Sequence, residues 1–288
     1  MVARGELRSP AERVRAIVAR SAGERVAARL PDGYHRMGRV LLLRLPRELA
    51  RHDPEIGRAW QRVLGVDTVI AQDGPIDGEL RRPRVRILAG ETTTTEVTEH
   101  GIRYRFDAAR TMFATGNRTE RQRISGLVRP GERVADLFAG IGYFSVPIAA
   151  RAAPARLVAV EKNPEAFGFL RENLAPYAAR TSIAAFLGDN REVPLPSGGF
   201  DRILLGYLPS SEPWIPRALA LADRSGAWIH VHRTEATRRP LSDGAAEVAT
   251  AFRAAGATIA EPPRSRDVKP YSPGRRHVVV DVRAVPGS

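Results

Sequence analysis

The sequence contains no cysteine, and this absence removes several kinds of chemistry at once. Without thiols the chain has no disulfide, no thiolate nucleophile and no cysteine-ligated zinc or iron–sulfur cluster. It also lacks any run of about 18 apolar residues, so we expect no membrane-spanning helix and no membrane partner. Residues 1–10 lack the apolar segment of a signal peptide. Together these absences indicate a cytoplasmic protein.

Lysine is almost as scarce as cysteine. Only Lys162 and Lys269 are lysines among the 45 basic residues, and the formal net charge is +13. Arginine binds phosphates in a bidentate manner and stacks on flat bases, so this charge suits a polyanionic partner such as RNA. An alanine- and arginine-rich composition is also typical of a GC-rich genome. The charge therefore supports an RNA partner without identifying it.

The 288 residues, 43% of them hydrophobic, suffice for one large domain and a smaller one. We divide the chain into a basic N-terminal helix (1–29), a small α+β domain (30–110), a linker motif (111–132) and a catalytic domain (133–288). The arginines of the first helix can face either RNA or solvent. In the last segment strands alternate with helices, which predicts a mainly parallel, doubly wound sheet.

Residues 134–144 have the pattern of a buried strand, a glycine turn and a helix. Gly140 and Gly142 allow a sharp turn and the close approach of a ligand, and Asp136 lies where open α/β sheets bind ligands. A nicotinamide site would have a third glycine, which is missing here. The D-x-F-x-G-x-G form is instead similar to the first motif of class I S-adenosylmethionine (SAM) transferases. A structural turn that binds nothing is the alternative.

Two further predicted strands also end in polar residues. The strand over 157–160 leads to Glu161, a position at which an acid can bind both ribose hydroxyls. The strand over 181–187 leads to Asp189 and Asn190, which can meet the edge of an adenine. Because the carboxyl ends of parallel strands share one edge of the sheet, we expect these side chains to lie close together.

Four blocks of residues together resemble the wybutosine-synthesising aminocarboxypropyl transferases, which are related to the tRNA guanosine N1-methyltransferases. The blocks are residues 112–123, 136–144, 188–191 and 206–212, and the resemblance runs from about residue 30 to residue 232. It implies an α/β class I SAM-methyltransferase fold, with a Rossmann-like, mainly parallel seven-stranded sheet preceded by a small α+β domain. It also implies SAM as the group donor.

The resemblance implies a role for particular residues of this chain. Those implied to contact SAM are Phe113, Gly116, Asn117, Asp136, Phe138, Gly140, Gly142, Glu161, Lys162, Asp189, Asn190, Gly206, Leu208, Pro209 and Ser210. Arg81 and Glu120 match residues that act near the acceptor base in the methyltransferase relatives. Glu120 can serve as a general base or simply stabilise a helix dipole. Arg81 can equally be one solvated arginine of a basic strand.

The block at 206–212 is similar to the aminocarboxypropyl subgroup rather than to the methyltransferases. A sulfonium carries three carbons, and the one that reacts is the one aligned with the acceptor at about 3–3.5 Å. A different loop at the amino acid end can present the γ-carbon in place of the methyl group. Ser210 can bind the amino acid end, or it can cap the following helix, since serine is a favoured cap.

Four functions remain open on this basis. The first is aminocarboxypropyl transfer from SAM to a modified guanosine in tRNA; the second is the same transfer to a small molecule; the third is N1-methylation of a tRNA guanosine. An RNA-binding protein with a vestigial SAM fold is disfavoured, because the acids at the strand ends are intact. His230 and His232 alternate on one strand, but without a third ligand we expect buried histidines and no metal. The sequence does not indicate an oligomeric state.

Overall fold

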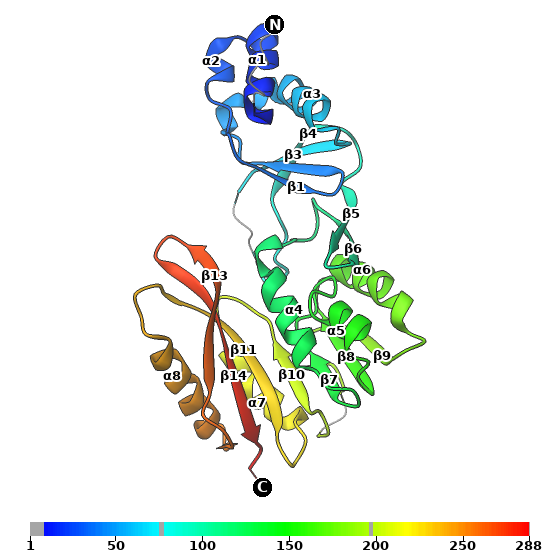
Figure 1. Ribbon diagram of the computed structural model, residues 1–288, viewed down its shortest axis with the longest axis vertical. Helices are drawn as coiled ribbons and strands as arrows, with labels where there is room; N and C mark the ends of the chain where they lie inside the picture. The colour runs from blue at the N-terminus through cyan, green and yellow to red at the C-terminus, as the bar shows by residue number, and fades with distance from the viewer. Residues whose placement is uncertain (1–8, 75–77, 196–197, 288) are drawn as a thin grey trace, which may run out of the picture. The chain divides into compact units, whose positions relative to one another are not determined.

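The computed structural model describes residues 9–74, 78–195 and 198–287 (Figure 1). Its contacts divide the chain into two compact units, unit 1 (Met1–Phe113) and unit 2 (Ala114–Ser288). The boundary therefore falls inside the predicted 111–132 linker. In the described ranges no helix is both long enough and apolar enough to cross a lipid bilayer.

Unit 1 combines helices with a small mixed sheet and a separate hairpin. In the sheet the central strands β2 and β3 pair in parallel, and the two outer strands pair antiparallel to them. The sheet has the order β1-β2-β3-β4, and β5 pairs with β6. The elements are α1 (Pro10–Ala22), α2 (Glu24–Ala27), β1 (Tyr34–Met37), β2 (Val40–Leu43), η1 (Arg47–His52), α3 (Asp53–Leu64), β3 (Thr68–Gln72), β4 (Val85–Ala89), β5 (Thr94–Glu99) and β6 (Ile102–Asp107). The hairpin turn lies at His100 and Gly101, as predicted, and both residues have positive φ angles of 49° and 79°.

The N-terminal helices share the hydrophobic core of unit 1. Val14 and Val18 of α1 pack in one cluster with Leu41 of β2 and Trp60 of α3. The prediction of a single helix up to residue 29 is wrong, because the chain breaks at Gly23, whose φ of 94° is left-handed and ends α1. The arginines of this segment therefore lie on short helices packed against the small domain.

Unit 2 is an α/β sandwich around a large sheet. Its sheet has the order β12-β14-β11-β10-β7-β8-β9, with β13 paired to β14 beside that path. The helical elements are η2 (Thr115–Asn117), α4 (Arg118–Leu127), α5 (Ser145–Arg151), α6 (Pro164–Leu174), η3 (Ala175–Tyr177), η4 (Glu212–Trp214), α7 (Ile215–Leu221) and α8 (Leu241–Ala254). The strands are β7 (Arg133–Asp136), β8 (Arg156–Glu161), β9 (Ser182–Leu187), β10 (Arg202–Leu205), β11 (Ala227–Ala236), β12 (Thr258–Ile259), β13 (Arg264–Ser272) and β14 (Arg275–Val285).

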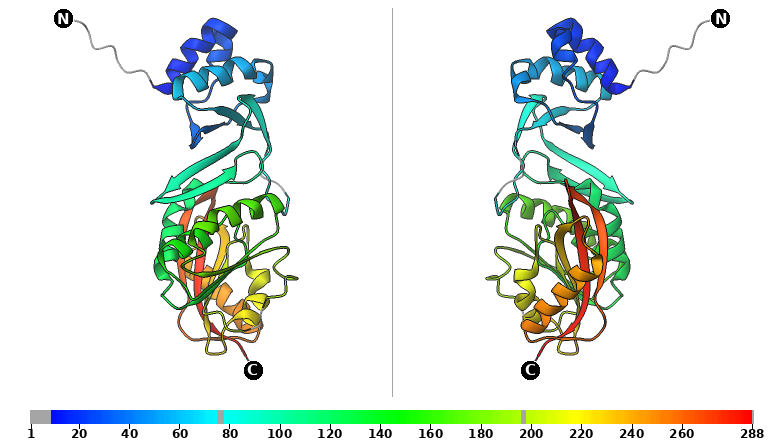
Figure 2. Two further views of the ribbon diagram at one scale, coloured as in Figure 1. Left: turned by 90° about the vertical axis from the view of Figure 1, so that its right-hand side faces the viewer. Right: turned by 90° about the vertical axis from the view of Figure 1, so that its left-hand side faces the viewer.

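The predicted mainly parallel sheet is confirmed. Strands β9, β8, β7, β10 and β11 pair in parallel, whereas β14 runs antiparallel to β11. Helices α7 and α8 bury Ile215, Val248 and Phe252 in the core on one face of the sheet. Helices α5 and α6 cover the opposite face (Figure 2). The loops that follow the parallel strands consequently emerge together at one edge.

Strand β13 is an element that the sequence did not reveal. Its nine residues, Arg264–Ser272, include a proline and several charges, and most are exposed. An edge strand with this composition lacks the alternation of apolar and polar residues by which strands are recognised. Pairing with the buried strand β14 therefore defines it.

Candidate functional site at the carboxyl edge of the sheet

The acid at the end of β7 is completely buried. The Oδ2 atom of Asp136 accepts a hydrogen bond of 2.7 Å from Ser145 Oγ, and its Oδ1 atom accepts one of 3.3 Å from the Phe138 amide. Burial raises the pKa of Asp136 to about 6, although the Ser145 hydrogen bond opposes that shift. The nearby Glu161 carboxylate also raises the pKa of Asp136, because like charges favour the protonated form.

Glu161, at the end of β8, connects the glycine turn to the start of α6. Its Oε2 atom accepts a 2.7 Å hydrogen bond from the Gly140 amide, and its Oε1 atom accepts one of 2.7 Å from the Asn163 amide. Burial raises the pKa of Glu161, and the backbone amides oppose the shift. Asn163 in turn caps α6 by accepting from the Glu165 amide at 3.0 Å, as predicted. A carboxylate has about four lone-pair positions, so Glu161 retains acceptor capacity for a ligand hydroxyl beside these backbone amides.

The two glycines of the turn satisfy both backbone and packing requirements. Gly140 and Gly142 have φ angles of 58° and 98°, in the left-handed region. A Cβ atom on Gly142 would lie 2.4 Å from Val146 Cγ2, and one on Gly140 would lie 2.5 Å from Tyr143 Cε2. The turn uses the residues predicted to begin the helix, so α5 starts at Ser145 rather than near Gly142.

The end of β9 carries an ionised acid and a buried amide. Asp189 accepts hydrogen bonds from Arg191 at 2.6 Å and from Lys162 Nζ at 3.0 Å, and these cations, Arg191 foremost, hold its pKa well below the usual range. Asn190 donates to the Leu137 carbonyl at 2.6 Å. Its Oδ1 atom is buried and has no partner among the described residues. An unsatisfied buried acceptor costs about 1–3 kcal/mol, so this position favours a donor from a ligand.

Aromatic rings gather beside these carboxylates. The ring centroids of Phe138 and Tyr207 are 5.3 Å apart, and Trp214 lies 5.0 Å from Phe138 and 5.3 Å from Tyr207. The Arg191 guanidinium lies 5.7 Å from the Trp214 ring centroid. Aromatic faces of this kind suit the flat base of a nucleoside. Sequence reasoning identified Phe138 but missed Tyr207 and Trp214, and the only available signal was their place after β10.

The loop after β10 uses its serines within the protein. Ser210 Oγ accepts a 3.3 Å hydrogen bond from the Glu212 amide, and Ser211 Oγ donates to the His232 carbonyl at 2.8 Å. Leu208–Pro209 is a cis peptide. Ser210 therefore forms a local serine turn just before η4, whose N-cap residue is Ser211. This local role is related to the capping role that the sequence left open.

The linker motif contributes two small features to unit 2. A Cβ atom on Gly116 would lie 2.9 Å from Lys269 Cδ, so the lysine side chain rests directly on this glycine. Asn117 has a buried Oδ1 atom without a partner in the described part of the chain. At the strand edge, a Cβ atom on Gly206 would lie 3.4 Å from the Phe144 ring. Both glycines therefore leave room that a larger residue would fill.

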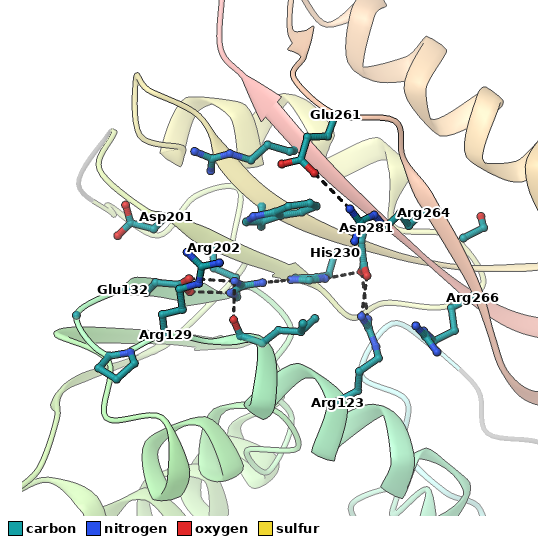
Figure 3. Close-up of a pocket in the computed structure, with 16 residues that line it drawn as sticks. Arg123, Arg129, Glu132, Asp201, Arg202, His230, Glu261, Arg264, Arg266 and Asp281 are labelled. Carbon is teal, nitrogen blue, oxygen red and sulfur yellow. Dashed lines mark hydrogen bonds and ion pairs between the residues drawn. The ribbon is translucent and has the colours of Figure 1, made fainter.

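Glu120 lies in a chain of buried charges that the sequence did not reveal. It is 2% exposed and is paired through both oxygens with Arg123, at 2.7 and 2.8 Å. Arg123 also contacts Asp281 at 2.6 Å, and Asp281 contacts His230 Nδ1 at 2.6 Å (Figure 3). His230 Nε2 lies 2.8 Å from an Arg202 nitrogen that can only donate. His230 is therefore neutral with its proton on Nδ1, and burial lowers its pKa.

A cavity of about 730 Å³ adjoins this chain of charges. Arg129, Arg202, Trp228 and Arg266 are among its lining residues (Figure 3). Arg202 begins β10, so the cavity lies toward the amino ends of the parallel strands and away from the carboxylates at their other end. It does not belong to the edge at which Asp136 lies.

The histidines of β11 are both buried, as expected. His232 Nδ1 lies 2.8 Å from His277 Nε2, and burial lowers the pKa of both rings, that of His277 to about 4. Within the described ranges, no three histidine, cysteine or acidic side chains are grouped so that they could hold a metal ion.

Arg81 and Phe113 belong to unit 1 and were predicted to lie at the site. Phe113 stacks on Phe106, with ring centroids 4.5 Å apart. Arg81 has a left-handed φ of 50°, and its Nη2 atom lies 3.8 Å from the sulfur of Met112. Arg81 precedes β4, so it is not part of the arginine-rich strand that the sequence indicated. Their predicted roles toward SAM and the acceptor remain predictions.

Comparison with known proteins gives matches over both units. The family model described as the TRM5/TYW2 methyltransferase domain matches residues 95–252, and the TYW2 N-terminal domain matches residues 14–93. A tRNA(Phe) (4-demethylwyosine(37)-C(7)) aminocarboxypropyltransferase of Pyrococcus horikoshii is 37% identical, covering 94% of this chain and 96% of the relative.

Solved structures show the same architecture. P. horikoshii TYW2 in complex with MeSAdo superimposes with a TM-score of 0.81 at 34% identity, covering 96% of this chain and 99% of that one. M. jannaschii TYW2 in complex with AdoMet gives a TM-score of 0.71 at 26% identity, covering 88% of this chain and 100% of that one. The predicted class I SAM-methyltransferase fold is confirmed by these likenesses.

Proposed function

We propose a reaction for this protein on the premise that the chain belongs to the TRM5/TYW2 methyltransferase family. The protein transfers the 3-amino-3-carboxypropyl group of SAM to a modified guanosine in tRNA. The observation that carries this proposal is the near full-length match to an aminocarboxypropyltransferase acting on tRNA(Phe). The family model that matches residues 95–252 covers the strand ends that carry Asp136, Glu161 and Asn190.

The residues of the edge fit SAM. Glu161 is suited to the ribose hydroxyls, because its carboxylate is fixed by two backbone amides and retains acceptor capacity. Asn190 offers a buried oxygen that lacks a donor within the described residues, which suits the adenine edge. Asp136 supplies a carboxyl beside the glycine turn, where the cationic sulfonium end would lie. We therefore propose these residues as the donor site, with Asp189 held ionised beside them.

SAM supplies the transferred group and leaves as methylthioadenosine. The bond between sulfur and the γ-carbon breaks with its electron pair going to sulfur, a bond forms from the acceptor carbon to the γ-carbon, and the acceptor carbon loses a proton. For this chemistry the loop from Gly206 to Ser211 must hold the amino acid end so that the γ-carbon faces the acceptor. Glu120 as the base for that proton remains a prediction, since the structure pairs it with Arg123.

Methylation of a tRNA guanosine is the second candidate. The observation that favours it is that the matching family model spans both TRM5 and TYW2 proteins. The two reactions leave different products from SAM, namely methylthioadenosine after aminocarboxypropyl transfer and S-adenosylhomocysteine after methyl transfer.

The test is a product assay with tRNA that carries 4-demethylwyosine and, in parallel, bulk tRNA. Protein, SAM and tRNA are incubated, and the nucleoside products are identified by mass spectrometry. We expect methylthioadenosine in proportion to the mass gained by the tRNA. S-adenosylhomocysteine would identify methylation. Binding of SAM with no turnover on tRNA would instead direct attention to a small-molecule acceptor.

tRNA is proposed as the partner, and the arginine content of the chain supports it. Each phosphate neutralised by a basic side chain releases a counterion, so affinity should fall steeply as the salt concentration rises. The net charge of +13 is consistent with several such contacts. Measuring the tRNA dissociation constant at several salt concentrations gives the number of phosphates contacted.

A further inference from the structure

Lys269 occupies an irregular part of strand β13. It pairs with His277 of β14, and the register shifts on both sides of it, between Asp267 and Lys269 and again between Pro270 and Ser272. Bulges of this kind redirect a side chain out of the regular alternation of a strand. Here the strand lies against η2 of the linker motif, and Lys269 is the residue that extends over it.

The space for Lys269 depends on a glycine. A Cβ atom on Gly116 would lie 2.9 Å from Lys269 Cδ and 3.3 Å from Nζ. The lysine is half-buried, and no carboxylate of the described residues forms an ion pair with it. Lys269 is thus a partly desolvated cation without an acidic partner among the described residues. The other lysine, Lys162, is by contrast paired with Asp189 at 3.0 Å.

The groups around Lys269 are basic. Burial and the charge of Arg121 lower the pKa of Lys269, and burial and Lys269 in turn lower that of His277. Arg121 is itself buried, donates to the Ala114 carbonyl at 2.6 Å, and lies 4.8 Å from the ring centroid of Tyr143. Tyr143 belongs to the glycine turn. A partly desolvated cation is costly in a medium of low dielectric constant, and an anion beside it offsets that cost.

We propose that Lys269 binds an oxyanion at the transfer site. This inference rests on the proposed function and assigns one part of it, the recognition of the group that is transferred. Since Arg121 lies over a residue of the donor turn, the carboxylate of the donor's amino acid end is the oxyanion expected there. An RNA phosphate has the same chemistry, and the experiment distinguishes the two sources.

The experiment compares two nucleosides, of which only SAM carries the amino acid end; SAM also has a positively charged sulfur, whereas the sulfur of methylthioadenosine is neutral. Dissociation constants for SAM and for methylthioadenosine, which has no carboxylate, are measured by calorimetry on the full chain. For Lys269→Gln we expect SAM to bind about tenfold more weakly, as for a lost charged hydrogen bond, with methylthioadenosine changed less than about twofold. Arg264→Gln removes one positive charge from the same strand, about 16 Å away at the rise of a strand, and should change neither ligand.

A second variant tests the same contact without removing the charge. Gly116→Ala keeps Lys269 but displaces its side chain, so it should weaken SAM selectively. Combining it with Lys269→Gln should add little, because both changes remove one interaction. Thermal melts of each variant verify that the fold is retained.

The outcomes separate the possibilities. If SAM is unaffected but tRNA binds more weakly and its salt slope falls by about one, the oxyanion is a phosphate. The proposal is overturned if neither SAM nor tRNA binding changes, or if SAM and methylthioadenosine weaken equally. Should wild-type protein bind neither nucleoside, the proposed function itself fails, which is a different result.

Discussion

Two parts of the carboxyl edge of the sheet in unit 2 carry ionisable groups of opposite sign and satisfy them differently: the acidic edge, formed by Asp136 and Glu161, and the basic edge, formed by Lys269 and His277. At the carboxyl ends of the parallel strands, Asp136 and Glu161 accept hydrogen bonds from a serine hydroxyl and from backbone amides. In the antiparallel strands β13 and β14, Lys269 is the register partner of His277, and no acid of the described ranges is paired with the lysine.

The difference separates a preorganised site from an incomplete one. A buried carboxylate held by amides keeps its position whether or not a ligand is bound, which is what a donor site requires. A buried cation without a counter-charge is costly until an anion arrives. Under the proposed function, the acidic edge is the part expected to hold the nucleoside portion of the donor, and the basic edge is the part expected to bind a group that carries negative charge.

Glu161→Gln should have the largest effect on the acidic edge. Glutamine keeps one carbonyl oxygen, so it can accept from the Gly140 amide or from the Asn163 amide but not from both, and its NH2 group would face the other N–H. Both the turn and the ribose contact should therefore be weakened. We expect SAM affinity to fall about 100-fold, corresponding to nearly 3 kcal/mol. Calorimetric titration measures it, with Glu172→Gln on the exposed side of α6 as a control. An affinity within threefold of wild type would show that Glu161 does not hold the ribose.

Asp136→Asn should weaken SAM binding about tenfold and yet stabilise the fold at pH 7.5. The pKa of Asp136 is raised to about 6 from an ordinary value of 3.8, so the folded state holds the proton more tightly than the unfolded state. The free energy of unfolding therefore decreases as pH rises from about 4 to about 6. Removing the charge should recover about 1–3 kcal/mol at pH 7.5, and urea unfolding at several pH values measures this.

Asp201 provides the matched control for Asp136. Its pKa is lowered, chiefly by a hydrogen bond from Arg133, so its charged form stabilises the fold and that contribution is lost as pH falls through the lowered pKa. Asp201→Asn should therefore destabilise the protein at pH 7.5. If both variants change stability in the same direction, burial does not govern the titration of Asp136.

The acidic edge was predictable from sequence, and the basic edge was not. Asp136, Glu161 and Asp189 each end a strand of regular apolar pattern, and parallel strands place their ends together. That logic requires only local patterns and one topological rule. The position of Asn163 as a helix cap was predictable for the same reason.

The remaining features depend on pairs that are far apart in the chain. His230 contacts Asp281 across 51 positions, and Arg123 contacts Asp281 across 158. Lys269 lies against Gly116 from an irregular part of β13, where the register shifts. An edge strand with so many charges has no residue pattern from which it could be predicted. For Glu120, the sequence indicated an acid early in a helix but not the arginine that neutralises it.

His277 should give the basic edge a pH dependence opposite to that of Asp136. Burial and Lys269 lower its pKa to about 4, and His232 also contacts the ring. A histidine kept neutral in the folded state contributes stability that is complete above pH 6.5 and is lost as pH falls toward 4. His277→Gln should make the free energy of unfolding depend less on pH in this acidic range. The decrease in that free energy between pH 6.5 and 4.5 should be smaller by about 1–2 kcal/mol than in the wild type.

The measurement is urea unfolding of wild type and of His277→Gln at pH 4.5 and 6.5. His100→Gln, a change at an exposed hairpin turn of unit 1, is the control for loss of an imidazole elsewhere. If the free energy of unfolding falls equally between pH 6.5 and 4.5 in all three proteins, His277 does not change its protonation on unfolding.

Ser210→Ala should have the smallest effect and decides between the two roles considered for this serine. The hydroxyl accepts from the Glu212 amide at 3.3 Å, which is the geometry of a local cap. Losing a cap costs about 0.5–1 kcal/mol of stability, and SAM and methylthioadenosine should keep their affinities within about twofold. If SAM alone weakened, Ser210 would join Lys269 in holding the amino acid end. Recognition of that end would then come from both sides of the sheet edge, which thermal melts combined with calorimetry of the single and double variants would establish.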